Sequence, residues 1–254
     1  MKIHNLYIII FFFFLFSCNE QSKVLNIGHR GAKGYVAENT IASISKAIEL
    51  GVDGVEIDVF RCSTGELVVF HDKTLEKLTN GYGHIEELTL DSIKKIKVLG
   101  KEKIPTLLEV MDFINSRIIL NIELKGKNTA IATAKLLNNY EFTSSMDIDN
   151  VFISSFDFDE LKIFSQQKTN IKIALLTDSN EDPLNYISKV KEIGGFAINP
   201  NFKTLNSKNV NEIKRNGLKI FTWTVNSYNE INKMKSLSVD GIISDYPDRV
   251  NPEY

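Results

Sequence analysis

Carboxylate side chains recur where predicted β-strands end in this 254-residue chain. Glu56 and Asp58 lie two residues apart in one β-rich run, and Glu123 ends another. Side chains at positions i and i+2 of a strand point to the same face, so Glu56 and Asp58 face the same way. Three carboxylates at one place repel one another unless a cation neutralises them. Because all-oxygen ligands suit Ca²⁺ or Mg²⁺ better than Zn²⁺, these acids are predicted to hold one divalent cation.

The same acids could instead form an ion-pair network with Arg30 and Lys125. The histidines favour the metal site. His29 follows the first predicted strand, and His71 follows an additional short strand. Because an unperturbed imidazole titrates near pH ~6.5, two of them beside a metal-bound anion would form an acid–base pair.

Eight β-rich runs alternate with stretches of helical period, and they would position these side chains. The alternation is the pattern of a TIM (β/α)₈ barrel, in which polar residues at the carboxyl ends of the strands meet at one mouth. A doubly wound open sheet is the alternative. The predicted strands are Val24–Ile27, Gly54–Val59, Ile118–Glu123, Val151–Ser154, Lys172–Leu176, Phe196–Asn199, Lys219–Thr224 and Gly241–Ser244. Helices are predicted to begin near Ile41, Thr106, Thr129, Asp159, Tyr186, Ser207 and Tyr228.

One insertion interrupts this alternation between the second strand and its helix. Glu66–Phe70 is predicted as an extra strand, and residues 72–103 are polar, charged and without regular period. Long loops at the strand ends of a barrel usually carry function. Within or near the insertion, His84 is predicted to lie on the surface and Cys62 to be structural.

Composition excludes several classes of protein. The chain is 43% hydrophobic and 24% charged, which argues against intrinsic disorder. Its formal net charge of −2 provides no electrostatic footprint for nucleic acid. Two cysteines cannot form a disulfide scaffold. The sequence leaves the oligomeric state open.

The N-terminus has the pattern of a secretory signal. Lys2 precedes an apolar stretch, Leu6–Phe16, that is too short to cross a bilayer core, which needs roughly 20 helical residues. Ser17 and Cys18 then lead into a polar segment, which resembles the lipobox of bacterial lipoproteins. We therefore expect a signal peptide at residues 1–17, lipidation of Cys18, and a domain at 18–254 anchored to a membrane of the bacterial cell envelope, facing the periplasm or the exterior. A plain signal peptide or an uncleaved anchor is the alternative.

The motifs, taken in order, resemble those of the glycerophosphodiester phosphodiesterase family. The resemblance runs from about residue 25 to about residue 250. It rests on His29-Arg30-Gly31-Ala32, Glu38-Asn39-Thr40, Glu56-Ile57-Asp58-Val59, Phe70-His71-Asp72, Thr79-Asn80-Gly81, Ile104-Pro105-Thr106-Leu107, Asn121-Ile122-Glu123-Leu124-Lys125, Ser154-Ser155-Phe156, Thr222-Trp223-Thr224-Val225-Asn226 and Asp240-Gly241-Ile242-Ile243-Ser244-Asp245-Tyr246-Pro247.

This resemblance implies a TIM barrel with the insertion as a subdomain, and it assigns roles to particular residues. The imidazoles of His29 and His71 would be the general acid and base, in an order that stays open. Glu56, Asp58 and Glu123 would hold Ca²⁺ or Mg²⁺. Arg30 and Lys125 would contact the phosphate, and Trp223 would line the pocket, with barrel core as its alternative. Glu38 and Asn39 would shape the first loop rather than touch the substrate.

The implied reaction is metal-dependent hydrolysis of small glycerophosphodiesters to glycerol 3-phosphate and an alcohol. A substrate hydroxyl would attack through a cyclic intermediate, with direct attack by water as the alternative. Other possible activities are hydrolysis of lysophospholipids or phosphoinositides, and non-catalytic binding by a membrane-tethered protein. The chain departs from the family pattern at Ala37, where proline is usual, and at Lys77 and Leu78 in the insertion.

Overall fold

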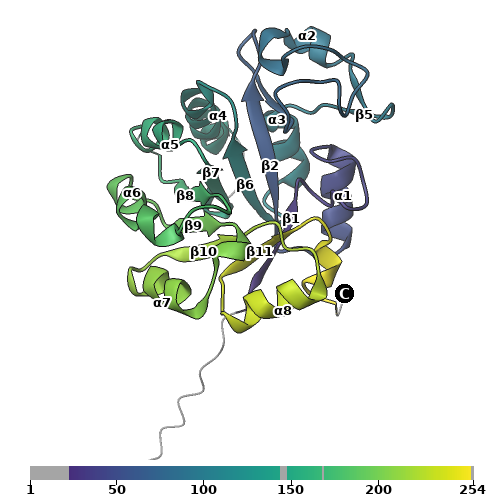
Figure 1. The fold of residues 1–254 in the computed structure, drawn as a ribbon. Helices are drawn as coiled ribbons and strands as arrows, with labels where there is room; N and C mark the ends of the chain where they lie inside the picture. The colour runs from purple at the N-terminus through teal and green to yellow at the C-terminus, as the bar shows by residue number, and fades with distance from the viewer. Residues whose placement is uncertain (1–22, 144–147, 168, 253–254) are drawn as a thin grey trace, which may run out of the picture.

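Parallel strands close into a barrel in the computed structural model, which describes residues 23–143, 148–167 and 169–252 (Figure 1). In these ranges a nine-stranded sheet consists of eight parallel strands and the antiparallel β3 (Leu67–Val69). The barrel closes because β1 pairs with both β2 and β11. This confirms the predicted TIM barrel and excludes the open sheet. The barrel strands are β1 (Leu25–His29), β2 (Gly54–Arg61), β6 (Ile119–Leu124), β7 (Val151–Ser155), β8 (Lys172–Thr177), β9 (Ala197–Pro200), β10 (Lys219–Thr222) and β11 (Gly241–Ser244).

Helices surround the barrel, and each predicted helix begins within one residue of its expected position (Figure 1). Local capping explains several of these starts. Thr106, Asn206 and Ser227 each form a capping box, in which the cap side chain and the side chain three residues later satisfy each other's backbone N–H. The surrounding helices are α1 (Ile41–Glu49), α3 (Leu107–Ile114), α4 (Thr129–Thr143), α5 (Phe158–Ser165), α6 (Ile187–Glu192), α7 (Ser207–Arg215) and α8 (Tyr228–Ser236).

Apolar side chains fill both faces of the barrel wall. Outward-facing residues such as Val55, Ile57 and Ile122 are completely buried in the main core cluster, which also contains side chains of the surrounding helices. Inside the barrel, Phe152 and Phe221 pack with ring centroids 5.2 Å apart. Both rings belong to an apolar cluster in the barrel interior that also contains Ile27 and Ile243. The polar residues at the carboxyl ends are left to form the mouth.

The insertion has a hydrophobic core of its own, which corrects the expectation of an irregular polar segment. It contains α2 (Leu90–Ile93), β4 (Lys97–Val98) and β5 (Glu102–Lys103), and it projects to one side of the barrel in Figure 1. Its core buries nine side chains: Phe60, Cys62, Val68, Phe70, Leu75, Ile85, Ile93, Val98 and Ile104. Cys62 is thus a buried free thiol, and His84 is exposed, as predicted.

The predicted signal peptide at 1–17 and the lipidation site Cys18 lie outside the residues that the structure describes. From residue 23 onward, none of the described helices has both the length and the apolar character needed to cross a bilayer.

Candidate active site

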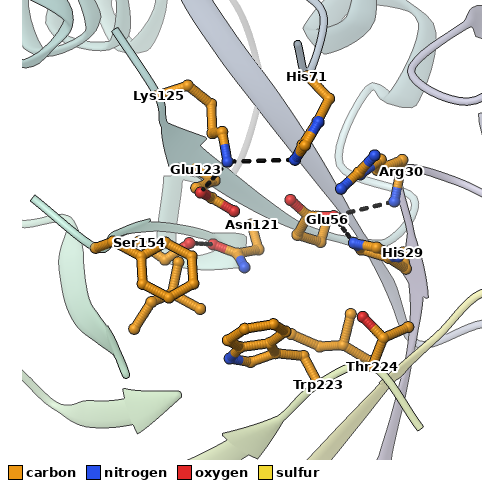
Figure 2. A pocket seen from close by; sticks show the side chains of 13 residues that line it. His29, Arg30, Glu56, His71, Asn121, Glu123, Lys125, Ser154, Trp223 and Thr224 are labelled. Atoms are coloured by element: carbon orange, nitrogen blue, oxygen red, sulfur yellow. Dashed lines mark hydrogen bonds and ion pairs between the residues drawn. The ribbon is translucent and has the colours of Figure 1, made fainter. Parts of the chain in front are cut away.

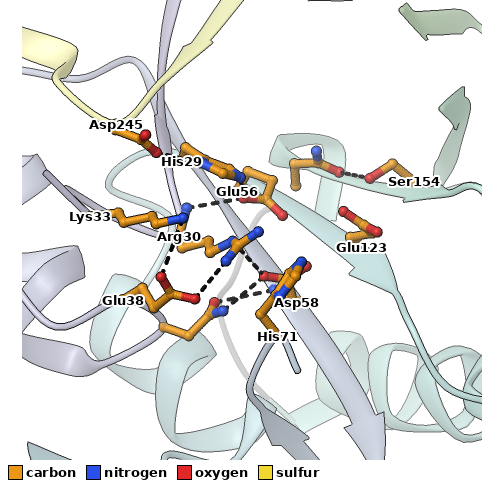
Figure 3. A network of polar contacts seen from close by, with 12 residues as sticks. His29, Arg30, Lys33, Glu38, Glu56, Asp58, His71, Glu123, Ser154 and Asp245 are labelled. Atoms are coloured by element: carbon orange, nitrogen blue, oxygen red, sulfur yellow. Dashed lines mark hydrogen bonds and ion pairs between the residues drawn. The ribbon is translucent and has the colours of Figure 1, made fainter. Parts of the chain in front are cut away.

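Three carboxylates from two neighbouring strands meet at the barrel mouth. One oxygen each of Glu56, Asp58 and Glu123 lies within 4.8 Å of the other two. The register of β2 and β6 explains this, because Asp58 pairs directly with Glu123. Between the two β2 acids, Ile57 points outward into the main core, so both acids face inward. The structure therefore brings together the three residues that strand spacing predicted to converge (Figure 3).

Burial next to like charges changes the ionisation of these acids. Removal from water, reinforced by the neighbouring carboxylates, raises the pKa of Glu56 well above its ordinary value. The same causes raise the pKa of Glu123 from 4.5 to about 7, although Lys125 opposes the shift. Arg30 Nε lies 3.2 Å from an oxygen of Asp58, and Lys125 Nζ lies 2.9 Å from an oxygen of Glu123. The ion-pair network left open by the sequence is thus present around the acids.

Two carboxylate oxygens of the cluster have no hydrogen-bond partner among the described residues. They are Glu56 Oε1 and Asp58 Oδ1, and both are buried. An unsatisfied buried polar atom is costly, and buried carboxylates are normally paired or bound to metal. Unpartnered oxygens within a group of three acids are the donor set expected for a hard divalent cation. The residues present therefore fit such an ion.

His29 lies on one flank of the acids, at the end of β1. Its Nδ1 is 2.6 Å from Asp245 Oδ1, and its Nε2 is 3.9 Å from Glu56 Oε2. Asn226 donates a 2.8 Å hydrogen bond to the other oxygen of Asp245 and so fixes that carboxylate. Burial lowers the pKa of His29 and outweighs the opposing effect of Asp245.

His71 lies on the other flank and is carried there by the hairpin of β2 and β3. This hairpin turns the chain back toward the mouth, where the N–H of Phe70 donates to the carbonyl of Asp58 at 3.0 Å. The Nδ1 of His71 is 2.5 Å from Asp72 Oδ1, and its Nε2 is 3.3 Å from Lys125 Nζ. Burial is also the largest cause of the lowered pKa of His71.

Both imidazoles therefore have the same arrangement. In each, a carboxylate faces Nδ1, so the neutral ring holds its proton there and presents an unprotonated Nε2. Figure 2 shows the two rings on the wall of one pocket, with Glu56 and Glu123 near them.

The pocket between the histidines has a cavity volume of about 100 Å³. Its charged side consists of the residues already described, and its other side is apolar. There, Trp223 and Phe156 meet edge to face with ring centroids 5.3 Å apart. Trp223 also packs against the interior cluster of the barrel, so it both lines the pocket and contributes to the core.

The first loop of the barrel holds two of the acids in place. Asn39 donates to Asp58 Oδ2 at 2.8 Å, and the N–H of Arg30 donates to Glu56 Oε2 at 3.0 Å. Glu38 binds the Arg30 guanidinium at 2.5 Å and does not itself reach the acids (Figure 3).

Sequence reasoning did not predict the contacts of four residues of this network, Asn39, Asp72, Asn226 and Asp245, although it expected Asn39 to shape the first loop. Three of them share one signal, since Asp72, Asn226 and Asp245 follow strand ends at the mouth, as the predicted catalytic residues do. Asn39 lies farther into its loop, and its contact with Asp58 follows from the folded loop alone.

Comparison with known proteins gives consistent matches over most of the chain. The sequence model described as "Glycerophosphoryl diester phosphodiesterase family" matches residues 29–249. A glycerophosphodiester phosphodiesterase of Caldanaerobacter subterraneus is 34% identical over 240 residues, which cover 89% of this chain and 96% of that protein.

Two solved structures share the fold at more than 25% identity. A phosphodiesterase of Oleispira antarctica, in complex with its product sn-glycerol-3-phosphate, superposes with a TM-score of 0.81 at 27% identity, covering 89% of this chain and 94% of that one. A glycerophosphodiester phosphodiesterase of Thermotoga maritima gives a TM-score of 0.73 at 28% identity, covering 89% of this chain and 96% of the other.

Proposed function

This chain belongs to the glycerophosphoryl diester phosphodiesterase family, and on that premise we propose that it hydrolyses small glycerophosphodiesters to sn-glycerol 3-phosphate and an alcohol, with His29 and His71 as the acid–base pair. Glycerophosphocholine and glycerophosphoethanolamine are the substrates that we expect. The observation that carries the proposal is a cluster of three buried acids beside two carboxylate-backed imidazoles, with Glu56, Glu123 and both imidazoles lining a single pocket.

Positive charge is the first requirement of the reaction, because a phosphodiester is already an anion and repels a nucleophile. Glu56, Asp58 and Glu123 would hold Ca²⁺ or Mg²⁺, which when bound offsets charge on the phosphate. Arg30 and Lys125, which are ion-paired with two of these acids, would add to this positive charge. Burial disfavours the charge on Lys125, but Glu123 and Asp58 outweigh it and raise the pKa of Lys125, so this amine stays protonated.

Proton transfer is the second requirement. One Nε2 takes a proton from the attacking hydroxyl, and the other gives a proton to the leaving alkoxide. Asp245 and Asp72 hold the Nδ1 proton of their respective rings, which keeps each Nε2 available on the pocket side. The lowered pKa values of His29 and His71 favour neutral rings near pH 7. The ring that acts as the acid must therefore take up a proton when the anionic substrate binds.

The test is release of sn-glycerol 3-phosphate by the purified chain from glycerophosphocholine and glycerophosphoethanolamine. Release that stops with a chelator and returns with Mg²⁺ or Ca²⁺ would support the proposal. Lysophospholipid micelles and a phosphoinositide make the comparison arms. Turnover of these lipids alone would show that the substrates are lipids rather than small glycerophosphodiesters. Substrate binding without turnover under saturating metal would show a binding protein.

We propose the cell envelope as the location, with the domain anchored through lipid on Cys18. The support is the residue pattern of the N-terminus described above. Metabolic labelling with a radioactive fatty acid tests it: the wild type should be labelled and recovered with membranes, and Cys18→Ala should lose the label. Equal labelling of both would show that Cys18 is not the acceptor.

A further inference from the structure

Each acid of the cluster has one oxygen already engaged by the protein. Glu56 Oε2 accepts from the backbone N–H of Arg30 at 3.0 Å, and Asp58 Oδ2 accepts from the Asn39 amide at 2.8 Å. Glu123 Oε1 accepts from Lys125 at 2.9 Å. In Glu56 and Asp58, the other oxygen of the same carboxylate has no hydrogen-bond partner among the described residues, although Asp58 Oδ1 lies 3.8 Å from Lys125 Nζ.

The two contacts from the first loop come from residues with unusual backbone geometry. Arg30 has a φ of 51° and Asn39 a φ of 57°, in the left-handed region that residues other than glycine seldom adopt. The two residues are also tied together, because the N–H of Asn39 donates to the carbonyl of Arg30 at 3.1 Å. Such geometry persists where the surrounding structure enforces it, and it is concentrated at functional sites.

Both polar atoms of the Asn39 side-chain amide form hydrogen bonds with Asp58. Its Nδ2 donates to the carboxylate, and its Oδ1 accepts from the backbone N–H of Asp58 at 3.2 Å. The side chain is 1% exposed, so water does not compete for these hydrogen bonds. We call the Arg30 N–H and the Asn39 amide the carboxylate clamp.

We propose that the carboxylate clamp limits Glu56 and Asp58 to one ligand oxygen each, so that the site prefers Mg²⁺ to Ca²⁺, with Asn39 as the positioning residue. This inference rests on the metal site of the proposed function. Mg²⁺ takes six ligands in a strict octahedron, usually one oxygen per carboxylate with several waters. Ca²⁺ takes six to eight oxygens and commonly uses both oxygens of a carboxylate. Three acids that each offer one oxygen meet the first requirement better than the second.

Isothermal titration calorimetry of the full chain with MgCl₂ and with CaCl₂ tests the inference without relying on activity. The informative variant is Asn39→Gly, because glycine accepts the left-handed backbone and only the amide is lost. Asn115→Gly is the matched control, since Asn115 is also left-handed, with a φ of 43°, at the carboxyl end of α3, away from the mouth.

The wild type should bind Mg²⁺ more tightly than Ca²⁺. Asn39→Gly should weaken Mg²⁺ binding by roughly 10- to 100-fold, the usual effect of losing a partner of a metal ligand. Ca²⁺ binding should change less, because a released Asp58 can offer both oxygens. The affinity ratio should therefore move toward Ca²⁺ in Asn39→Gly and stay unchanged in Asn115→Gly.

The inference would be overturned if the wild type bound Ca²⁺ as tightly as Mg²⁺ or more tightly. An unchanged affinity ratio in a folded Asn39→Gly variant would also overturn it. The wild-type comparison holds even if that variant does not fold. The inference and the proposed function can fail separately. If the chain prefers Ca²⁺ but still releases sn-glycerol 3-phosphate in a chelator-sensitive way, only the role of the carboxylate clamp is contradicted. Binding of neither ion removes the metal site itself.

Discussion

At the scale of single residues, His29 and His71 reach the same pocket by different routes. His29 is the last residue of a barrel strand, whereas His71 follows the short β3 that doubles back along β2. Each has a carboxylate on Nδ1, and in both burial lowers the pKa. Under the proposed function, this shared arrangement suits the two rings to transfer a proton in opposite directions.

Removing either imidazole should stop turnover while leaving the metal in place. We expect His29→Ala and His71→Ala each to lower kcat by roughly 10²- to 10⁴-fold, the usual contribution of one acid or base. Metal affinity measured by calorimetry should change little, because neither ring is among the three acids. His84→Ala, at an exposed histidine of the insertion, is the control and should keep full activity. A large loss of metal affinity in either site variant would make that histidine a metal ligand instead.

Asp245 should act through His29. Asp245→Asn is expected to lower kcat by at least roughly 10-fold, because the carboxylate that fixes the ring and its Nδ1 proton is lost. Asp245 raises the pKa of His29 against the effect of burial, so its removal should move the His29 limb of the pH–rate profile to lower pH.

The matched control is Asp248→Asn, whose carboxylate accepts from Tyr35 at 2.8 Å. Among the described residues, His29 pairs with Asp245 and Glu56 and not with Asp248. An unshifted pH profile in Asp245→Asn, with kcat lowered equally in both variants, would show a general structural effect.

The acids could be predicted from sequence because their convergence follows from strand periodicity and from the meeting of parallel strands at one mouth. The contact of Asp245 with His29 and that of Asn39 with Asp58 could not. Asp245 is 216 positions from His29, and the contact between Asn39 and Asp58 depends on left-handed backbone within a loop. Neither spacing nor propensity encodes such contacts.

At the scale of elements, the insertion supports the hairpin that carries His71. Phe70 precedes that histidine and is buried in the core of the insertion together with Ile93 of α2. We therefore expect the stability of this small core to affect the position of His71, one of the two proposed acid–base residues.

Ile93→Ala tests this coupling. Ile93 is completely buried, so its truncation should cost about 2–5 kcal/mol of local stability. We expect kcat to fall several-fold as His71 loses its fixed position, with metal affinity nearly unchanged. Ile213→Ala on α7 is an equally buried control in the main core. If thermal unfolding shows similar destabilisation but kcat falls equally in both variants, the insertion has no special link to His71.

Element prediction succeeded for the barrel and failed for the insertion, for one physical reason. Barrel strands and surrounding helices bury long apolar faces, which give clear periods in the sequence. The elements of the insertion are short: α2 has four residues, and β4 and β5 have two each. Their buried side chains are spread among lysines and glutamates, so no period is visible.

At the scale of the whole molecule, metal binding should couple to folding stability and to pH. Without metal, the raised pKa of Glu123 means that its proton stabilises the fold below the ordinary value of 4.5, and this contribution is lost as pH rises to about 7. Bound metal requires the deprotonated acid, so its stabilising effect should grow across the same range. The lowered pKa values of His29 and His71 make the fold more stable as pH rises. This contribution is present both with and without metal.

The expected result is a metal-induced rise in Tm that is small at pH 5.5 and largest above pH 7. At 100 times Kd the stabilisation is about 2.7 kcal/mol, or roughly 5–10 °C for a domain of this size. Differential scanning calorimetry with Mg²⁺ and with chelator measures it, and Glu123→Gln should abolish the effect. An equal rise at pH 5.5 and pH 8.5 would show that metal does not bind the acids whose pKa values are raised.

The central claim is that Glu56, Asp58 and Glu123 together hold one divalent cation between His29 and His71. Diffraction from crystals soaked with Mn²⁺ and sn-glycerol 3-phosphate tests it most directly, because Mn²⁺ gives an anomalous signal and takes similar oxygen ligands. We expect one anomalous peak within about 2–2.6 Å of an oxygen of each acid, with the phosphate beside it and within reach of both Nε2 atoms. A peak elsewhere, or none at the acids under saturating metal, would contradict it.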